Sequence, residues 1–326
     1  MSDSAISSYP DYLEAKEAVD AAARNQDVWR QFIDALRGRG SSLSILEVGG
    51  GTGRTAAEVL DAMTDPGIGQ IEYTLVDASE ANVEAARARL HPYAASAGTR
   101  EDDAECDGRD EGQPEISLRV VQRDLLAFSK QTTQRFDAVI AQSVLDLVPV
   151  VDVLPALSTR LEPNGLWYLP LHYDGITAFE PVLDRDLDAQ IQSLYNRSMM
   201  DPSDPNRGSD GAWTGRRLLS RLRSVNATLL EAEPSDWILF AGEAGFSRAE
   251  SAFLRAILGF VEAELRDHPE LNSERFEWWL TERRRQLAEE ELIFLTHQID
   301  ILAQGGKTSG SRVDNTQPSK SGASST

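Results

Sequence analysis

Short apolar runs and amphipathic repeats alternate through the first half of the chain. The run at 43–48 ends before closely spaced glycines, and comparable runs follow at 71–76, 116–121, 136–141 and 166–169. Runs of this length between turn signals are typical of buried parallel strands. The segments between them, such as 53–63 and 79–90, carry apolar residues on one helical face. The alternation predicts an α/β fold, a doubly wound sheet with helices on both sides.

The flanking regions have other patterns. Val28, Phe32 and Leu36 recur every four residues, so 11–38 predicts one or two helices. Near the end of the chain, 227–231 and 236–240 predict the closing antiparallel hairpin of the sheet. The following stretch predicts helices, one of them with an apolar stripe of Leu292, Leu295, Ile299 and Leu302.

These patterns divide the chain into consecutive segments. They are an N-terminal helical cap (1–42), a sheet core (43–171), a lid or substrate insertion after the fifth strand (172–213), the end of the core sheet (214–247), C-terminal helices (248–303) and a disordered tail (304–326). The acidic stretch 95–115 has few apolar residues and predicts a solvated loop.

Composition narrows the range of partners. The chain has 53 Asp and Glu against 32 Lys and Arg, a net charge of -21, which disfavours general binding to nucleic acid or anionic membranes. Such acidity also suggests adaptation to a high-salt habitat. No apolar run is long enough to span a bilayer, and the start of the chain lacks the pattern of a signal peptide. The single cysteine, Cys106, cannot form an internal disulfide, so we expect a cytoplasmic protein.

The chemically informative residues follow the first strand. Glu47 lies at the strand end, and glycines occupy alternate positions at Gly49, Gly51 and Gly53. Glycine lets the backbone turn sharply and lets a ligand approach closely, and amides at the start of the next helix would point at that ligand. The order hydrophobic–Glu–x–Gly–x–Gly–x–Gly resembles the first motif of the class I S-adenosylmethionine-dependent methyltransferases.

The resemblance continues along the chain. Phe136-Asp137 opens the fourth strand, and a Leu-x-Pro-x-Gly turn at 161–165 precedes the fifth. It implies S-adenosylmethionine as the cofactor and a Rossmann-like sheet of seven strands, the last one antiparallel. It also implies that Asp124 bonds the adenine amino group while the Leu125 amide donates to a ring nitrogen.

Other cofactor contacts are expected from position. The Glu47 carboxylate suits the cationic end of the amino acid. Asp77, at the end of the second strand, is placed to accept hydrogen bonds from the ribose hydroxyls. Gln142 follows the fourth strand, and ligands of such sheets bind at the carboxyl ends of the strands. Asp77 and Asp124 could instead serve only as helix caps.

The glycines leave two alternatives open. Read from Gly51, Gly-x-Gly-x-x-Ala fits the dinucleotide fingerprint, although Glu47 suits a cation better than a pyrophosphate and that register starts two residues late. The second alternative is a glycine-rich turn without a ligand.

The insertion at 172–213 would lie above the cofactor and select the substrate. His172 could remove a proton from the nucleophile during methyl transfer, and Asp146 could orient that nucleophile. His172 could instead only bond a loop carbonyl, and many methyltransferases need no base. Tyr12 and Lys16 share a helix face that, together with Trp29, would cover the pocket or pack on the sheet edge.

We therefore expect a methyltransferase that acts on a small molecule, without a metal. The Asn/Asp-Pro-Pro-Tyr/Phe motif of base and glutamine methylation does not follow the fourth strand, and the double-glutamate hairpin of arginine methyltransferases is missing. The alternatives are a regulatory module that binds S-adenosylmethionine or a dinucleotide without catalysis, and a protein methyltransferase. The C-terminal helices, with Arg283-Arg284-Arg285 on their exposed side, would cap the fold or form a homodimer.

Overall fold

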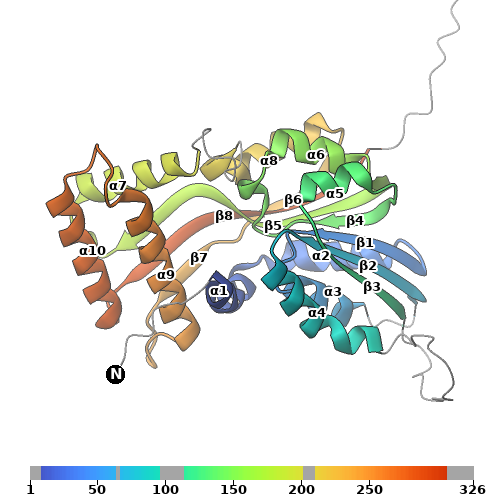
Figure 1. Cartoon of the computed structure of the whole chain (residues 1–326), viewed down its shortest axis with the longest axis horizontal. Coiled ribbons are helices and arrows are strands. Elements are labelled where there is room, and N and C mark those ends of the chain that lie inside the picture. The colour runs from blue at the N-terminus through green and yellow to red at the C-terminus, as the bar shows by residue number, and fades with distance from the viewer. Residues whose placement is uncertain (1–8, 64–66, 96–113, 201–209, 307–326) are drawn as a thin grey trace, which may run out of the picture.

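A computed structural model describes residues 9–63, 67–95, 114–200 and 210–306. Its centre is a sheet of eight strands in the order β3-β2-β1-β4-β5-β8-β6, with β7 paired to β8 (Figure 1). The strands are β1 (Ser42–Val48), β2 (Gln70–Asp77), β3 (Glu115–Gln122), β4 (Phe136–Ile140), β5 (Leu161–Glu180), β6 (Thr228–Pro234), β7 (Trp237–Phe240) and β8 (Ile293–Gln304).

The first five strands are parallel and form the doubly wound half of the sheet. Ile45 of β1 belongs to a core cluster on one face and Leu46 to a cluster on the other, because neighbouring strand residues point to opposite sides. The crossover helices of this half are α3 (Arg54–Ala62), α4 (Glu80–Ala95), α5 (Leu125–Gln131) and α6 (Val150–Ser158). The predicted α/β fold class, a Rossmann-like doubly wound sheet whose last strand is antiparallel, is confirmed, although the sheet has eight strands and not the expected seven.

The closing strands differ from the predicted hairpin. β6 and β7 do not pair with each other: both pair antiparallel with β8, which also pairs antiparallel with β5. The helical stripe predicted across 292–302 is therefore wrong, because these residues form β8. Thr296, Gln298 and Asp300 occupy buried alternate positions of this strand. Polar residues at the inward positions hide the period of two on which strand prediction depends.

The fifth strand also continues further than predicted. β5 runs to Glu180, so the first residues assigned to the lid insertion belong to the sheet. The remaining helices are α1 (Tyr9–Ala23), α2 (Gln26–Arg37), α7 (Arg185–Ser198), α8 (Thr214–Ser224), α9 (Arg248–Leu265) and α10 (Ser273–Ala288), with short turns η1 (Leu145–Leu147) and η2 (Gly211–Trp213).

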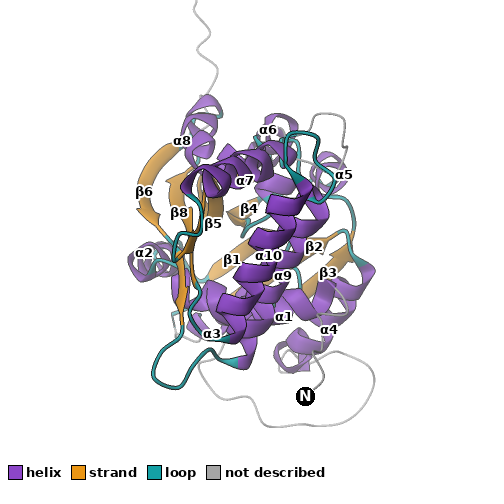
Figure 2. Cartoon of the chain, turned by 90° about the vertical axis from the view of Figure 1, so that its left-hand side faces the viewer, coloured by secondary structure: helices purple, strands orange, loops and turns teal. Residues whose placement is uncertain are grey.

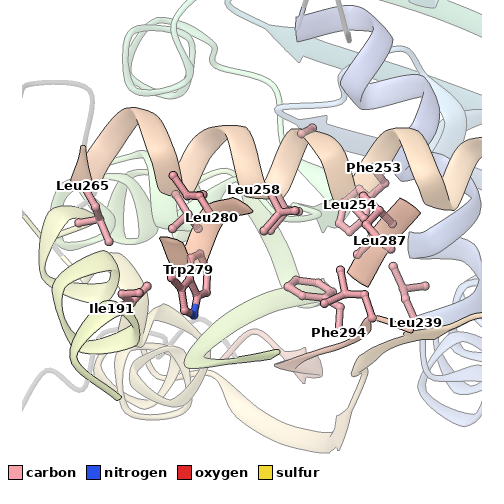
Figure 3. Packing of buried hydrophobic residues seen from close by; sticks show 14 of the residues in the cluster. Ile191, Leu239, Phe253, Leu254, Leu258, Leu265, Trp279, Leu280, Leu287 and Phe294 are labelled. Atoms are coloured by element: carbon pink, nitrogen blue, oxygen red, sulfur yellow. The ribbon is translucent and has the colours of Figure 1, made fainter. Parts of the chain in front are cut away.

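A separate hydrophobic cluster joins α1, α7, α9 and α10 to the far ends of β5, β7 and β8 (Figures 2 and 3). Phe253 and Leu258 of α9 pack there with Trp279 of α10 and Phe294 of β8 (Figure 3). Arg283 was expected on the exposed side of α10 but is fully buried, where Nη2 pairs with Asp188 Oδ1 at 2.7 Å. Its guanidinium fits there because this carboxylate and the Pro181 carbonyl accept its hydrogen bonds.

Within the described ranges, no helix is long and apolar enough to cross a membrane. The predictions for Cys106, for most of the acidic loop at 95–115, for part of the insertion and for nearly all of the tail lie outside the described residues.

Candidate active site

A cavity of about 620 Å³ lies at the carboxyl ends of the parallel strands and continues toward the helical end of the molecule. One part, here called the cofactor chamber, is lined by the loops after β1, β2, β3 and β4. The other part, the distal chamber, is lined by α1, α7, α9 and the inner faces of β5, β7 and β8. The cavity is therefore shared by the doubly wound half and the helical end.

Nearly all of the residues predicted to bind the cofactor meet in the first chamber. Those that line it are Glu47, Gly49, Gly51, Asp77, Asp124, Leu125 and Gln142. Gly53 does not line the cavity. It caps α3 with φ +78°, and a Cβ there would lie 3.2 Å from the Cβ of Ala86. The role of Gly53 is thus to start α3 and let it pack against α4.

Glu47 lies at the end of β1 and is almost fully buried. Tyr73 on the neighbouring strand donates its hydroxyl to Glu47 Oε2 at 2.8 Å. Burial raises the pKa of Glu47 to about 8, because the charged carboxylate is poorly solvated there. A cationic group in the chamber would therefore favour ionisation of Glu47. Sequence reasoning missed Tyr73, because an aromatic residue inside a strand looks like ordinary core.

Asp77 is a junction between the glycine loop and the start of α4. Its Oδ2 accepts from the Gly51 amide at 2.9 Å. Its Oδ1 accepts from the Ser79 amide at 2.9 Å and from Asn82 Nδ2 at 3.1 Å. The carboxylate is thus held rigidly at the cavity wall, and it does more than cap a helix.

Asp124 and Gln142 are positioned in different ways. Asp124 caps α5, where its Oδ1 accepts from the Ala127 amide at 2.8 Å, so the simple capping role exists alongside its place in the cavity wall. Gln142 Oε1 accepts from Thr55 at 3.1 Å and its Nε2 donates to Asp20 at 3.2 Å. The amide of Gln142 therefore links α3 to α1.

The first helix, α1, forms part of the cavity wall. Glu17 accepts a hydrogen bond from Thr52 in the glycine loop at 2.6 Å and pairs with Arg89 at 2.7 Å. Lys16 lines the cavity, where it forms an ion pair with Asp20 and lies 3.3 Å from Ser143 Oγ. The sequence did not single out Glu17, because its partners lie 35 and 72 residues away.

Of the three residues expected to cover the pocket, two line the cavity and one does not. Tyr12 and Lys16 line the cavity. Trp29 lies outside the cavity wall, where its ring packs against Phe32 and Tyr168 and beneath the Arg24 guanidinium. The buried residues of α2, Val28, Phe32 and Leu36, face the sheet, and in this orientation of the helix Trp29 points away from the cavity.

The two candidate catalytic residues differ in position. His172 is fully buried outside the cavity wall, and burial lowers its pKa to about 3. Its neighbour Tyr173 lines the cavity instead. A neutral imidazole on the far side of β5 does not fit the predicted role of general base. Asp146 does line the cavity, its Oδ1 is buried without a hydrogen-bond partner among the described residues, and burial raises its pKa.

The distal chamber contains residues that the sequence did not reveal as site residues. Thr177, Thr296 and Gln298 line it from β5 and β8, and Trp237 lines it from β7. Asp20 accepts from Trp237 Nε1 at 3.1 Å, and burial raises the pKa of Asp20. These residues are missed because their strands were assigned to a hairpin, a helix and a lid. In the described part of the chain, no group of three or more His, Cys, Asp or Glu side chains could hold a metal.

Comparison with known proteins agrees with this geometry. Residues 46–167 match the family model described as a methyltransferase domain, and no curated protein matches. This match covers β1 to the first part of β5, which carry the cofactor chamber. It confirms the predicted methyltransferase family for this part of the chain and, with it, S-adenosylmethionine as the cofactor.

Solved structures with a similar chain path are distant. The YcgJ protein from Bacillus subtilis is 11% identical, with 87% of this chain and 99% of that chain covered and a TM-score of 0.45. A SAM-dependent methyltransferase from Thiobacillus denitrificans, in complex with S-adenosyl-L-homocysteine, is 15% identical, with 87% and 92% covered and a TM-score of 0.43. The cyclopropane synthase MmaA2 from Mycobacterium tuberculosis is 11% identical, with 84% and 83% covered and a TM-score of 0.42. These similarities are too weak to indicate the substrate of this protein.

Proposed function

We propose that this protein transfers the methyl group of S-adenosylmethionine to a small molecule held in the distal chamber. The observation that carries the proposal is the continuity of one cavity between the strand ends and the chamber under α1, α7 and α9. A cofactor at the glycine loop and an acceptor in the distal chamber would face each other within this cavity. Such a shared space would align the two reactants for direct transfer, and the sulfonium is already activated.

Within the cofactor chamber, we assign each polar residue a partner on S-adenosylmethionine. Glu47 faces the amino acid ammonium, Asp77 the ribose hydroxyls, and Asp124 with the Leu125 amide the adenine ring. Gln142 holds α1 over the site through Asp20. The support is that all of these residues line one cavity and that Asp77 is fixed by Gly51, Ser79 and Asn82.

In the transfer step, a lone pair of the acceptor forms a bond to the methyl carbon while the carbon–sulfur bond breaks. The sulfonium becomes the neutral thioether of S-adenosylhomocysteine, and the hydroxyl or neutral amine acceptor, which takes on the positive charge as it is methylated, releases one proton. Asp146 is the residue that we propose to orient the acceptor and receive this proton. Its raised pKa and its unpartnered Oδ1 in the cavity wall support this role.

The test is incubation of the purified protein with methyl-labelled S-adenosylmethionine and a cell extract separated by size. We expect label in the small-molecule fraction together with formation of S-adenosylhomocysteine. Label in the protein fraction would instead favour a protein methyltransferase. Binding of S-adenosylmethionine without any turnover would favour a regulatory module. A cytoplasmic location and a homodimer through α9 and α10 stay predictions.

A further inference from the structure

We infer that the acceptor is a largely apolar molecule without a negative charge that presents a hydroxyl or amino hydrogen to the side chain of Gln298. The inference rests on the proposed function, because it describes what the distal chamber would hold during transfer. Three features of that chamber carry it: aromatic walls, the lack of a free cation among its described lining residues, and a buried acceptor oxygen that lacks a donor.

The walls of the distal chamber present ring surface. Tyr173 and Trp237 line it from the sheet, and Phe260 lines it from α9. The polar atoms of the first two are already engaged: Tyr173 bonds Thr177 and Asn196, each at 2.8 Å, and Trp237 Nε1 donates to Asp20. These side chains therefore offer apolar faces, which favour a substrate with a large apolar surface.

The charges around the chamber disfavour an anionic substrate. Lys16 is the cation that lines the cavity from α1, and it is paired with Asp20 and lies over the Trp237 ring, 5.1 Å from its centroid. The other described cations in the cavity wall, Arg54 and Arg123, follow β1 and β3 and thus lie in the cofactor chamber. A carboxylate or phosphate in the distal chamber would lose its hydration without gaining a free cationic partner.

Gln298 supplies a specific polar contact. It lies directly opposite Tyr173 in the β5–β8 pairing, lines the cavity and is only 1% exposed. Its Nε2 donates to Thr296 Oγ1 at 3.1 Å, whereas its Oε1 is buried without a partner among the described residues. Buried acceptors are rarely left unpaired, because their lost hydration is costly. A substrate that donates a hydrogen bond would satisfy this oxygen.

A buried hydrogen-bond acceptor such as Gln298 Oε1 selects among substrates. A site built to bond a hydroxyl or amino hydrogen rejects an analogue that lacks it, since the buried oxygen then stays unpaired. Gln298 is thus a specificity-determining residue that anchors the substrate, and the apolar walls set its shape.

The test compares three probes of similar shape by calorimetry on protein saturated with S-adenosylhomocysteine at neutral pH. They are uncharged 2-naphthol, 2-methylnaphthalene without the hydroxyl, and anionic 2-naphthoate. We expect 2-naphthol to bind more tightly than 2-naphthoate. We expect the affinity ratio of 2-naphthol to 2-methylnaphthalene to fall about tenfold in Gln298→Leu, the size of a lost hydrogen bond to a buried acceptor.

A matched control is Gln134→Leu, a glutamine before β4 that bonds Ser44 and lies outside the cavity wall. It should leave the ratio unchanged. Unaltered binding of S-adenosylhomocysteine in Gln298→Leu shows that the variant is folded. An unchanged ratio in Gln298→Leu, no binding of 2-naphthol, or equal binding of 2-naphthoate would overturn the inference. Failure of the unmodified protein to bind S-adenosylhomocysteine would overturn the proposed function itself, before any probe is added.

Discussion

At the scale of single residues, Glu47 is a side chain whose protonation state we expect to change with what the cavity holds. It is buried, its hydrogen-bond partner is the Tyr73 hydroxyl, and its pKa is raised to about 8. The raised pKa favours the protonated carboxyl at neutral pH when no cation lies beside it. An ammonium group beside it stabilises the carboxylate and drives the proton off.

Ligand binding is thus expected to release a proton from Glu47. Since the ligand binds the ionised form, the affinity for S-adenosylhomocysteine should rise with pH up to about 8 and then level off. Calorimetry at pH 7 in buffers of different ionisation enthalpy should count close to one proton released. Glu47→Gln should weaken binding and abolish the release. Equal proton release by Glu47→Gln and by the unmodified protein would contradict this account of Glu47.

Asp146 gives a second expectation at this scale. Asp146→Asn removes a proton acceptor but keeps the size of the side chain, so kcat should fall roughly a hundredfold, the low end for a general base. The Kd of S-adenosylhomocysteine should stay within a factor of two or three. Asp152→Asn, an exposed change on α6, is the matched control and should leave both unchanged. A kcat within twofold of normal in Asp146→Asn would remove the residue from the mechanism.

At the scale of secondary structure, α1 is the element that completes the site. It lies beside α9 and β7 (Figure 1). Its Glu17 accepts a hydrogen bond from Thr52 in the glycine loop and forms an ion pair with Arg89 on α4. Closing elements of this kind govern ligand release. The contact between Glu17 and Thr52 ties α1 to the glycine loop, which we propose binds the cofactor.

Glu17→Ala should therefore loosen this cover. We expect S-adenosylhomocysteine to dissociate about five- to tenfold faster, since a charged hydrogen-bond network of this type contributes about 1–1.5 kcal/mol. Stopped-flow displacement measures the rate. Glu14→Ala, on the exposed face of the same helix, should behave like the unmodified protein. Equal dissociation rates for the two variants would show that α1 does not hold the ligand.

The sequence predicts the doubly wound half better than the helical end, for a physical reason. β1 and β2 are buried on both faces, so their apolar runs are continuous and their polar ends stand out. β8 buries Thr296, Gln298 and Asp300, and its pattern therefore resembles neither a core strand nor an amphipathic one. The same polar residues face the cavity or support its wall. The buried polar side chains that make β8 hard to predict from sequence are therefore the ones that belong to the site.

The candidate site follows the same division. Glu47, Asp77 and Asp124 are predictable because each ends or follows a recognisable strand. Gln298 and Glu17 are not predictable, because their roles in the site depend on residues far away in the chain. His172 shows the opposite error: its position after the fifth strand suggests a base, but the extension of β5 buries it outside the cavity.

At the scale of the whole molecule, the dominant feature is charge. A net charge of -21 on 326 residues makes the folded surface repel itself, although ion pairs such as Arg266–Glu277 and Arg197–Glu270 offset part of this locally. Exposed pairs of this kind contribute little individually. The long-range repulsion is therefore the larger electrostatic effect on stability.

Added salt should stabilise the protein, because screening weakens this repulsion. Between roughly 0.01 and 1 M sodium chloride the Debye length falls from about 30 to about 3 Å, and we expect Tm to rise by several degrees, about 1–2 kcal/mol in stability. Thermal denaturation followed by circular dichroism measures the change. A Tm that is flat over this range would remove the proposed link between acidic composition and a high-salt habitat.

The central claim is that one cavity binds S-adenosylmethionine through carboxylates at neighbouring strand ends. The most direct measurement is calorimetric titration of S-adenosylhomocysteine into the purified protein and into Asp77→Ala. The account predicts one site per chain in the unmodified protein and at least tenfold weaker binding in Asp77→Ala, since the proposed contact of this carboxylate with the ribose hydroxyls would contribute about 1.4 kcal/mol or more. No heat with the folded, unmodified protein, or equal affinity in the variant, would contradict it.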